Sequence, residues 1–186
     1  MAVKLLDESR GIRALHLIKD VFDSCGLELI LIGGTSLGAY RDKKFCVGDC
    51  DIDFAVLHEH FREKIMEVTL ELMKKHCICK LYSYPYNYPR AMNVEVCEGV
   101  NWTRVDIMDY DLKDNIRFCA HSKKDYCLVY PVRIFENMNS TEFYGRNFKV
   151  PTPTDEYLTI HYTDSWRVPD PNDSGGRNKE WGFFGK

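Results

Sequence analysis

The stretch Gly33-Gly34-Thr35-Ser36-Leu37-Gly38-Ala39-Tyr40-Arg41, followed after a spacer by Asp51-Ile52-Asp53, decides how this chain is interpreted. It comes directly after Leu29-Ile30-Leu31-Ile32, an apolar run that is typical of a buried strand. Two glycines at this point allow a backbone geometry and a close ligand approach that a Cβ atom would block. The stretch therefore predicts a strand that leads into a short helix.

The start of that helix has the features of an anion-binding site. Thr35 or Ser36 is expected to cap the helix, while its unpaired N–H groups face an anion such as a phosphate. Gly33 and Gly34 permit close approach of the anion. Arg41 adds a fixed cation if it faces the same side, and is surface charge if it faces solvent. Contacts with a phosphate-bearing substrate are therefore predicted for these residues.

The segment Asp51-Ile52-Asp53 predicts a cation site. Alternation along a strand puts both carboxylates on one face, with Ile52 and Phe54 on the other. Like charges at this spacing repel, so one carboxylate would tend to hold a proton unless a cation lay between them. A hard cation with oxygen ligands, Mg²⁺ or Mn²⁺, would resolve the conflict.

A third carboxylate comes from the strand expected at Thr103–Tyr110. Alternation there puts Arg104 and Asp106 on the face opposite to Val105. Asp106 is then placed to join the aspartate pair, and an aspartate at a solvated strand edge is the alternative. Arg104 is a candidate substrate-binding residue beside it. Asp109 is a weaker candidate because it lies on the other face.

These motifs resemble the LicD/fukutin branch of the polymerase-beta-type nucleotidyltransferase superfamily, whose pattern runs roughly Gly-Thr-Leu-Leu-Gly-Ala-x-Arg and then Trp-Asp-Asp-Asp-Ile-Asp. The positions in register are Gly34, Thr35, Leu37, Gly38, Ala39, Arg41, Asp49, Asp51, Ile52 and Asp53. The chain departs from the pattern at Ser36, Gly48 and Cys50, which stand for a leucine, the tryptophan and the middle aspartate. A later segment is also similar to the end of the family domain, through Tyr157, Leu158, Tyr162 and Trp166.

The resemblance implies a nucleotidyltransferase fold of the α/β (α+β) class, with a mixed central sheet flanked by helices. It implies that Asp51, Asp53 and Asp106 are the catalytic residues and hold Mg²⁺ or Mn²⁺, since a third acidic residue in this superfamily comes from a neighbouring strand. The substrate-binding residues that it implies are Gly33, Gly34, Thr35, Ser36, Arg41, Asp49 and Arg104.

The resemblance also implies a reaction. Relatives in this branch transfer a phosphoryl-linked group, such as phosphocholine or an alditol phosphate, from a CDP-type donor to a hydroxyl on a glycan or small molecule. Two alternatives stay open: a nucleotidyltransferase that moves a nucleoside monophosphate from a triphosphate, and a catalytically inactive nucleotide-binding module. The first reaction releases a nucleoside monophosphate, and the second releases pyrophosphate.

Length and composition exclude several other classes. The chain has 186 residues, of which 45% are hydrophobic and 28% charged, and a net charge of −3 argues against an extended nucleic-acid-binding surface. No apolar run approaches the ~20 residues of a transmembrane helix, and the first residues turn acidic too early for a signal peptide, so a cytoplasmic location is expected. The eight cysteines contain no C-x₂-C pair, which favours reduced thiols over zinc.

The remaining pattern predicts a single domain over residues 1–166 and an irregular tail over 167–186. Amphipathic helices are expected at residues 7–25 and 58–76, and a further helix is expected to be capped by Thr154. Strands are expected at 91–97, 116–118 and 128–130, with a hairpin over 143–150. Two aromatic segments could contact a substrate: the turn Tyr82–Pro89, and the tail residues Trp181, Phe183 and Phe184.

Overall fold

The structure is a computed structural model and describes residues 5–83, 90–120, 126–169 and 179–181. Its helical elements are α1 (Glu8–Ser24), α2 (Gly33–Leu37), η1 (Gly38–Asp42), α3 (His58–Phe61), α4 (Ile65–Lys74), η2 (Val132–Phe135), α5 (Thr154–Tyr162) and η3 (Asp164–Arg167). Its strands are β1 (Ile30–Leu31), β2 (Asp51–Leu57), β3 (Ile78–Tyr82), β4 (Ala91–Glu98), β5 (Asn101–Lys113), β6 (Ile116–Ala120), β7 (Tyr126–Pro131), β8 (Asn139–Phe143), β9 (Arg146–Val150) and β10 (Lys179–Trp181).

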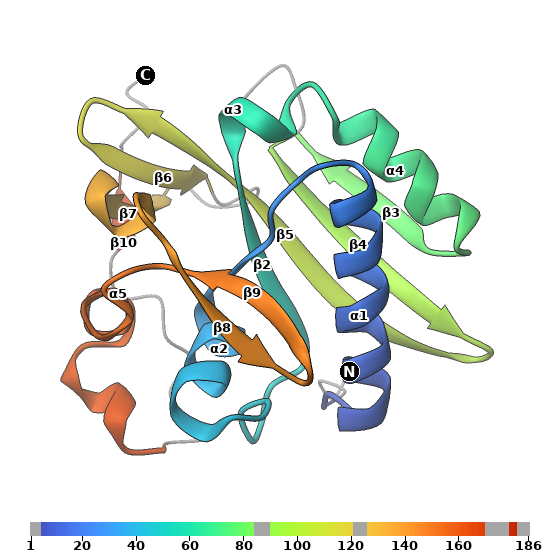
Figure 1. Cartoon of the computed structure of the whole chain (residues 1–186), viewed down its shortest axis with the longest axis horizontal. Helices are drawn as coiled ribbons and strands as arrows, with labels where there is room; N and C mark the ends of the chain where they lie inside the picture. The colour runs from blue at the N-terminus through green and yellow to red at the C-terminus, as the bar shows by residue number, and fades with distance from the viewer. Residues whose placement is uncertain (1–4, 84–89, 121–125, 170–178, 182–186) are drawn as a thin grey trace.

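These strands form one mixed sheet. Its order is β10-β7-β6-β5-β2-β1-β9-β8, and β4 pairs with the first half of β5 and carries β3 at its other side. The pairs β2–β5 and β1–β9 are parallel, and the other pairs are antiparallel. Helices lie against both faces of this sheet (Figure 1), so the expected mixed sheet flanked by helices is confirmed.

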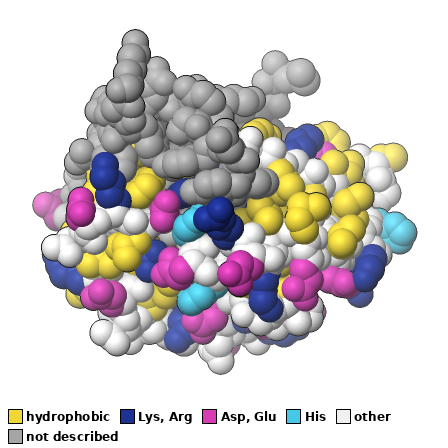
Figure 2. All heavy atoms as spheres, turned by 90° about the horizontal axis from the view of Figure 1, so that it is seen from above, with side chains coloured by type: hydrophobic (Ala, Val, Ile, Leu, Met, Phe, Trp, Pro, Cys, Tyr) yellow, Lys and Arg dark blue, Asp and Glu magenta, His cyan; other side chains and the backbone are white. Residues whose placement is uncertain are grey.

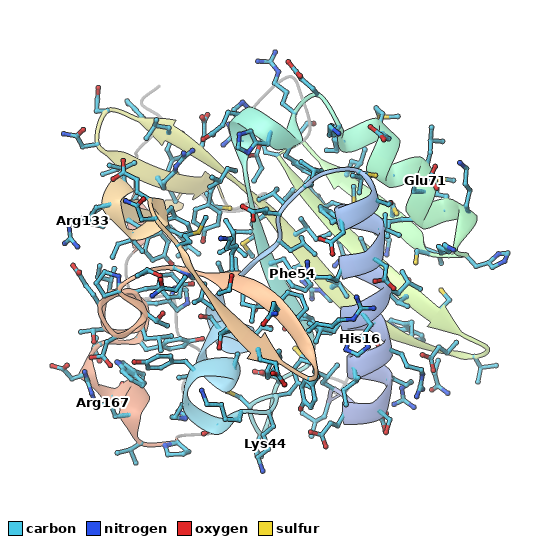
Figure 3. The ribbon with its side chains drawn as sticks, in the orientation of Figure 1. His16, Lys44, Phe54, Glu71, Arg133 and Arg167 are labelled. Atoms are coloured by element: carbon cyan, nitrogen blue, oxygen red, sulfur yellow. The ribbon has the colours of Figure 1, made fainter. Side chains whose placement is uncertain are left out.

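The two faces of the sheet bury two separate cores. Ile52 and Phe54 point from β2 into the first core, which α1 and α4 cover, and Figure 3 shows Phe54 between the sheet and α1. Ala55 points the other way, into a second core that is rich in aromatic side chains from β5, β7 and α5. Asp51 and Asp53 share the face of Ala55, because successive side chains on a strand alternate. The carboxylates therefore lie on the aromatic face, away from α1.

Helix α1 is fixed by its cap and by its apolar stripe. The carboxylate of Asp7 accepts a hydrogen bond from the backbone N–H of Arg10 at 2.9 Å, and Ile18 and Phe22 are fully buried against the sheet. The helix ends before Gly26, whose φ of 69° is in the left-handed region, as the sequence predicts. No helix in the described part of the chain is long and apolar enough to cross a membrane.

The predicted helix over residues 58–76 is wrong as a single element. It divides into α3 and α4, and α4 buries Val68 and Leu72 while Met66, Leu70 and Met73 are each more than half exposed. Figure 2 shows apolar side chains gathered on this side of the molecule. The sequence analysis also missed β3.

Two further expectations are corrected by the structure. Thr154 does not cap α5, because its hydroxyl donates to the carbonyl of Pro151 at 2.8 Å and Pro153 takes the N-cap position. The tail is not wholly irregular, because Lys179–Trp181 forms β10 and pairs with β7. Residues 84–89 of the aromatic turn, and Phe183 and Phe184, lie outside the described residues.

Asp109 belongs to a buried ionic cluster on the face of β5 that Ile107 shares, not to the acidic site on the opposite face. Its Oδ2 atom lies 3.0 Å from Nε of Arg90 and 2.6 Å from Nδ1 of His58, while Arg90 also binds Asp111 at 2.7 Å. Burial raises the pKa of Asp109 to about 6, although the charge of Arg90 lowers it. The negative charges of Asp109 and Asp111 therefore compensate the buried positive charge of Arg90, and removal of one group would leave another uncompensated.

We expect Asp109→Ala to lower the free energy of unfolding by about 3 kcal/mol, because it leaves the buried guanidinium of Arg90 without its fully buried counter-charge. Asp164→Ala is the control, since Asp164 is 89% exposed and pairs with Arg167 on the surface. We expect that control to change stability by less than ~0.5 kcal/mol. Urea denaturation measures the free energy of unfolding of both variants. An equal loss in Asp109→Ala and Asp164→Ala would contradict the assignment of Asp109 to a buried, charge-compensated cluster.

Candidate active site

The parallel register of β2 and β5 brings three carboxylates together. Asp53 lies directly opposite Asp106, and Asp51 lies opposite Arg104. Carboxylate oxygens of Asp51, Asp53 and Asp106 all lie within 4.8 Å of one another. Within the part of the chain that the structure describes, this is the group of acidic, histidine or cysteine side chains close enough to share a metal ion. The convergence predicted from strand alternation is therefore present in the structure, and metal binding stays a prediction.

Burial and mutual repulsion oppose the ionisation of Asp49, Asp51 and Asp53. Burial, followed by the charges of Asp51 and Asp106, raises the pKa of Asp53 well above its usual range. Burial and Asp106 also raise the pKa of Asp51, and burial with Asp51 raises that of Asp49 to about 6. A divalent cation between the oxygens would remove this repulsion, so the donor set and its charge fit Mg²⁺ or Mn²⁺.

Asp106 is held by two side chains that donate to it. Arg104 donates from Nε to Oδ1 at 3.0 Å and from Nη2 to Oδ2, and its Nε lies 3.7 Å from Asp51. Asn93, directly opposite Asp106 on β4, donates from Nδ2 to Oδ1. Sequence reasoning missed Asn93, because the pairing of β4 with β5 sets its position and the local pattern around it gives no signal.

The two glycines are explained by the carboxylates that they face. Gly33 has a φ of 52°, and a Cβ atom there would lie 3.0 Å from Oδ2 of Asp53. A Cβ atom on Gly34 would lie 2.9 Å from Oδ1 of Asp49. Side chains at these positions would push both carboxylates away. The N–H of Gly33 donates to the Tyr157 hydroxyl at 2.9 Å, which ties α2 to α5.

Thr35 and Ser36 do not cap α2 as predicted. Ile32 takes the N-cap position without a side-chain hydrogen bond, and the N–H of Ser36 donates to the Ile32 carbonyl at 2.9 Å. The Thr35 hydroxyl instead accepts from the backbone N–H of Asp53 at 2.9 Å, so it fixes α2 against β2. The N–H groups of Gly34 and Thr35 are then the ones left as candidate phosphate donors.

A cavity of about 510 Å³ opens beside Gly34 and Asp49. Its volume is in the range of cofactor and substrate pockets, ~300 to 1,000 Å³. Tyr162 and Trp166 from the α5–η3 segment form part of its wall, and Lys44 also lines it. Figure 3 shows Lys44 and Arg167 along the same edge of the molecule. The family-like residues near the end of the domain therefore contribute to this cavity.

Arg41 lines the same cavity but is already bonded to protein groups. It donates to both carboxylate oxygens of Asp42, at 2.8 and 2.7 Å, and to the carbonyl of Trp166 at 2.7 Å. These bonds lower the pKa of Asp42 and join η1 to η3. Arg41 is therefore not a solvated surface charge, and its contact with a phosphate stays a prediction.

Cys50 stands where the family pattern has its middle aspartate. Burial, and then the charge of Asp51, raises the pKa of its thiol to about 11, so it is neutral at physiological pH. It therefore cannot supply the missing negative charge. Asp49, Asp51 and Asp53 retain the other acidic positions of the pattern.

We expect Gly33→Ala to lower stability by at least ~1 kcal/mol, the cost of a left-handed backbone in a residue with a Cβ atom. It should also weaken Mn²⁺ binding, because the methyl group displaces Asp53. Gly145→Ala is the control, since Gly145 has a φ of 76° and open space around its Cα. Denaturation checks the backbone cost, which both variants share, and Mn²⁺ titration distinguishes them. Equal Mn²⁺ affinity in both would contradict the role assigned to Gly33.

Two solved structures share the fold of this chain. The chain resembles the solution structure of the antibiotic-resistance factor ANT(2'')-Ia, with a TM-score of 0.54 and 15% identity over 89% of this chain and 77% of that one. It also resembles the crystal structure of ANT(2'')-Ia in complex with adenylyl-2''-tobramycin, with a TM-score of 0.50 and 15% identity over 76% and 68% of the two chains. At this identity the likeness establishes the fold alone.

Comparison of the sequence with protein-family profiles identifies the family of this chain. No curated protein sequence matches the chain significantly. The family profile described as "LicD/FKTN/FKRP, nucleotidyltransferase domain" matches residues 26–153, which is more than half of the chain and includes the glycines and all three converging carboxylates. Together, the profile match and the fold support a transferase of nucleotide-related groups. The chain belongs to the LicD/FKTN/FKRP nucleotidyltransferase-domain family.

Proposed function

We propose that this chain is a Mg²⁺- or Mn²⁺-dependent transferase that moves a phosphoryl-linked group from a CDP-type donor to a hydroxyl acceptor. The transferred group is of the phosphocholine or alditol phosphate type, and the acceptor is a glycan or a small molecule. The observation that carries the proposal is the cluster of Asp51, Asp53 and Asp106 beside a nucleotide-sized cavity.

The donor would lie in the cavity next to Gly34. Its diphosphate would meet the N–H group of Gly34 and the ammonium group of Lys44, because both residues line the cavity. Tyr162 and Trp166 offer aromatic surface to the rest of the nucleotide. Arg41 would hold this wall in place through Asp42 and Trp166, whether or not it also reaches a phosphate.

The acceptor would approach from the other side of the acidic cluster, where β4 and β5 present Asn93 and Asp106. Asp106 is placed to accept the proton of the acceptor hydroxyl as its oxygen attacks the phosphorus that carries the transferred group. The new oxygen–phosphorus bond forms as the bond from that phosphorus to the bridging oxygen breaks, and CMP leaves. Attack opposite to the leaving group requires donor and acceptor on different sides of the carboxylates.

Asp51 and Asp53 would hold the cation, whose chemistry is to neutralise charge that develops on the phosphate oxygens. Their backbone positions are fixed independently of a ligand. Asp53 is anchored by its N–H to Thr35, and Gly33 leaves room for its carboxylate. The pair is therefore preorganised for a cation by the strand and by α2.

Product analysis tests the reaction. The protein is incubated with Mg²⁺ and, in turn, CDP-choline, CDP-ribitol and the four nucleoside triphosphates, and the products are separated by chromatography. Mg²⁺-dependent release of CMP supports the proposal. Release of pyrophosphate from a triphosphate would establish nucleotidyl transfer in its place, and no turnover of any donor would favour an inactive nucleotide-binding module.

We expect Asp53→Asn to lower turnover by more than ~100-fold, beyond the effect typical of residues that only support a metal ligand. The same variant should not melt earlier than wild type when cations are absent. The folded-state pKa of Asp53 lies above the ~3.9 of an unfolded chain, so its ionisation costs stability as pH rises above that value. Asparagine removes this cost at neutral pH.

Asp164→Asn is the matched control for this substitution, because Asp164 is exposed and distant from the cluster in sequence and in contacts. Turnover and melting temperature are measured for both variants at pH 7 in the presence and absence of EDTA. Normal turnover by Asp53→Asn would remove the residue from the reaction. A marked drop in its melting temperature would make its role structural.

A further inference from the structure

Arg104 lies directly beside Asp106, the third carboxylate of the cluster. Its guanidinium forms a two-pronged contact with the carboxylate, through Nε to Oδ1 and Nη2 to Oδ2. This geometry matches a carboxylate in a way that a point charge cannot. The same group lies 3.7 Å from Asp51, so its positive charge is inside the acidic cluster and not at its margin.

The hydrogen bonds of Asp106 leave little room for a metal. An ionised carboxylate has about four lone-pair positions. Arg104 fills one on each oxygen, and Asn93 fills the second on Oδ1. One position remains, on Oδ2. Asp106 is 17% exposed, so this position is open to a small group that approaches from solvent.

Asp53 differs from Asp106 in this respect. In the part of the chain described by the structure, its carboxylate receives no hydrogen bond, although it lies among three other aspartates. Asp51 has Arg104 near it only at the longer distance of 3.7 Å. A divalent cation would therefore meet less competition at Asp51 and Asp53 than at Asp106.

The charges lead to the same conclusion. The guanidinium of Arg104, which stays protonated in proteins, offsets the charge of Asp106. The carboxylates of Asp51 and Asp53 then carry −2 between them when both are ionised. One divalent cation balances what is left. A second one would have to compete with the guanidinium of Arg104 for the oxygens of Asp106.

We propose that Arg104 is the built-in counter-ion of Asp106, so that the cluster binds one divalent cation, at Asp51 and Asp53, in place of two. Arg104 is then a positioning residue. Together with Asn93 it orients Asp106 so that the remaining lone pair of Oδ2 faces the acceptor hydroxyl. This inference rests on the cation dependence of the proposed function, but not on the identity of donor or acceptor.

The proposal is tested by counting bound Mn²⁺ with calorimetry and electron paramagnetic resonance, without any substrate. Wild type is expected to bind one ion per chain. Arg104→Met should bind a second ion, because it exposes Asp106 and removes a competing charge. Arg104 is 52% exposed, so its loss should leave the fold intact. Arg133→Met is the control, since Arg133 is 56% exposed and pairs with Glu156, and it should bind one ion with unchanged affinity.

The double variant Arg104→Met/Asp106→Asn gives the sharpest comparison, because it removes one positive and one negative charge together. We expect it to bind one ion with a Kd within about threefold of wild type. The reason is that the carboxylates of Asp51 and Asp53 are intact and the net charge of the protein is unchanged. Two bound ions in wild type would overturn the proposal. It would also be overturned if the double variant lost Mn²⁺ binding to the extent expected for Asp53→Asn, which removes a ligand of the cation. Failure of every variant to bind Mn²⁺ would overturn it as well, and would also remove the cation from the proposed function.

Discussion

The parallel pairing of β2 with β5 is the constraint on which the rest of the site depends. It sets Asp53 against Asp106 and Asp51 against Arg104, and so decides which charges face one another. A shift of one residue would turn every side chain of the shifted strand to the opposite face and replace Asp106 by an apolar neighbour. Both strands contribute to holding this register, because Phe54 of β2 and Ile107 of β5 are fully buried in the core under α1 and α4. Core packing on one face thus positions the carboxylates on the other.

The aromatic core beneath the site holds the glycine stretch and α2 in position, as the first core holds the carboxylate strands. Tyr157 is fully buried, and its hydroxyl accepts the hydrogen bond from Gly33. Arg41 and Trp166 join the end of η1 to η3. Because α2 is only a short helix, these contacts and the Thr35–Asp53 bond hold it in place more than its own hydrogen bonds can. The glycine stretch therefore works as part of a folded unit and not as an isolated motif.

Much of this arrangement could be predicted from local sequence, and the reason is periodicity. The alternation in Asp51–Val56 and in Thr103–Tyr110 was enough to put the three carboxylates on one face, and the resemblance to a known family supplied the fold. Contacts made across strands or between distant elements gave no local signal. Asn93 lies beside Asp106 only through the register of β4, and Arg41 was expected to be either a phosphate ligand or solvated, whereas the neighbouring Asp42 binds it. The capping role predicted for Thr35 failed because its hydroxyl accepts from Asp53 on β2, and that of Thr154 failed because its hydroxyl donates to the carbonyl of Pro151.

We expect folding alone to assemble a cation site at Asp51 and Asp53. Anomalous diffraction from crystals soaked in Mn²⁺ tests this most directly, because it locates the ion without assuming a reaction. We expect one peak between the carboxylates of Asp51 and Asp53, at coordination distance from both, with Arg104 still on Asp106. A peak at another group of residues, or no peak at the cluster under saturating Mn²⁺, would contradict the account.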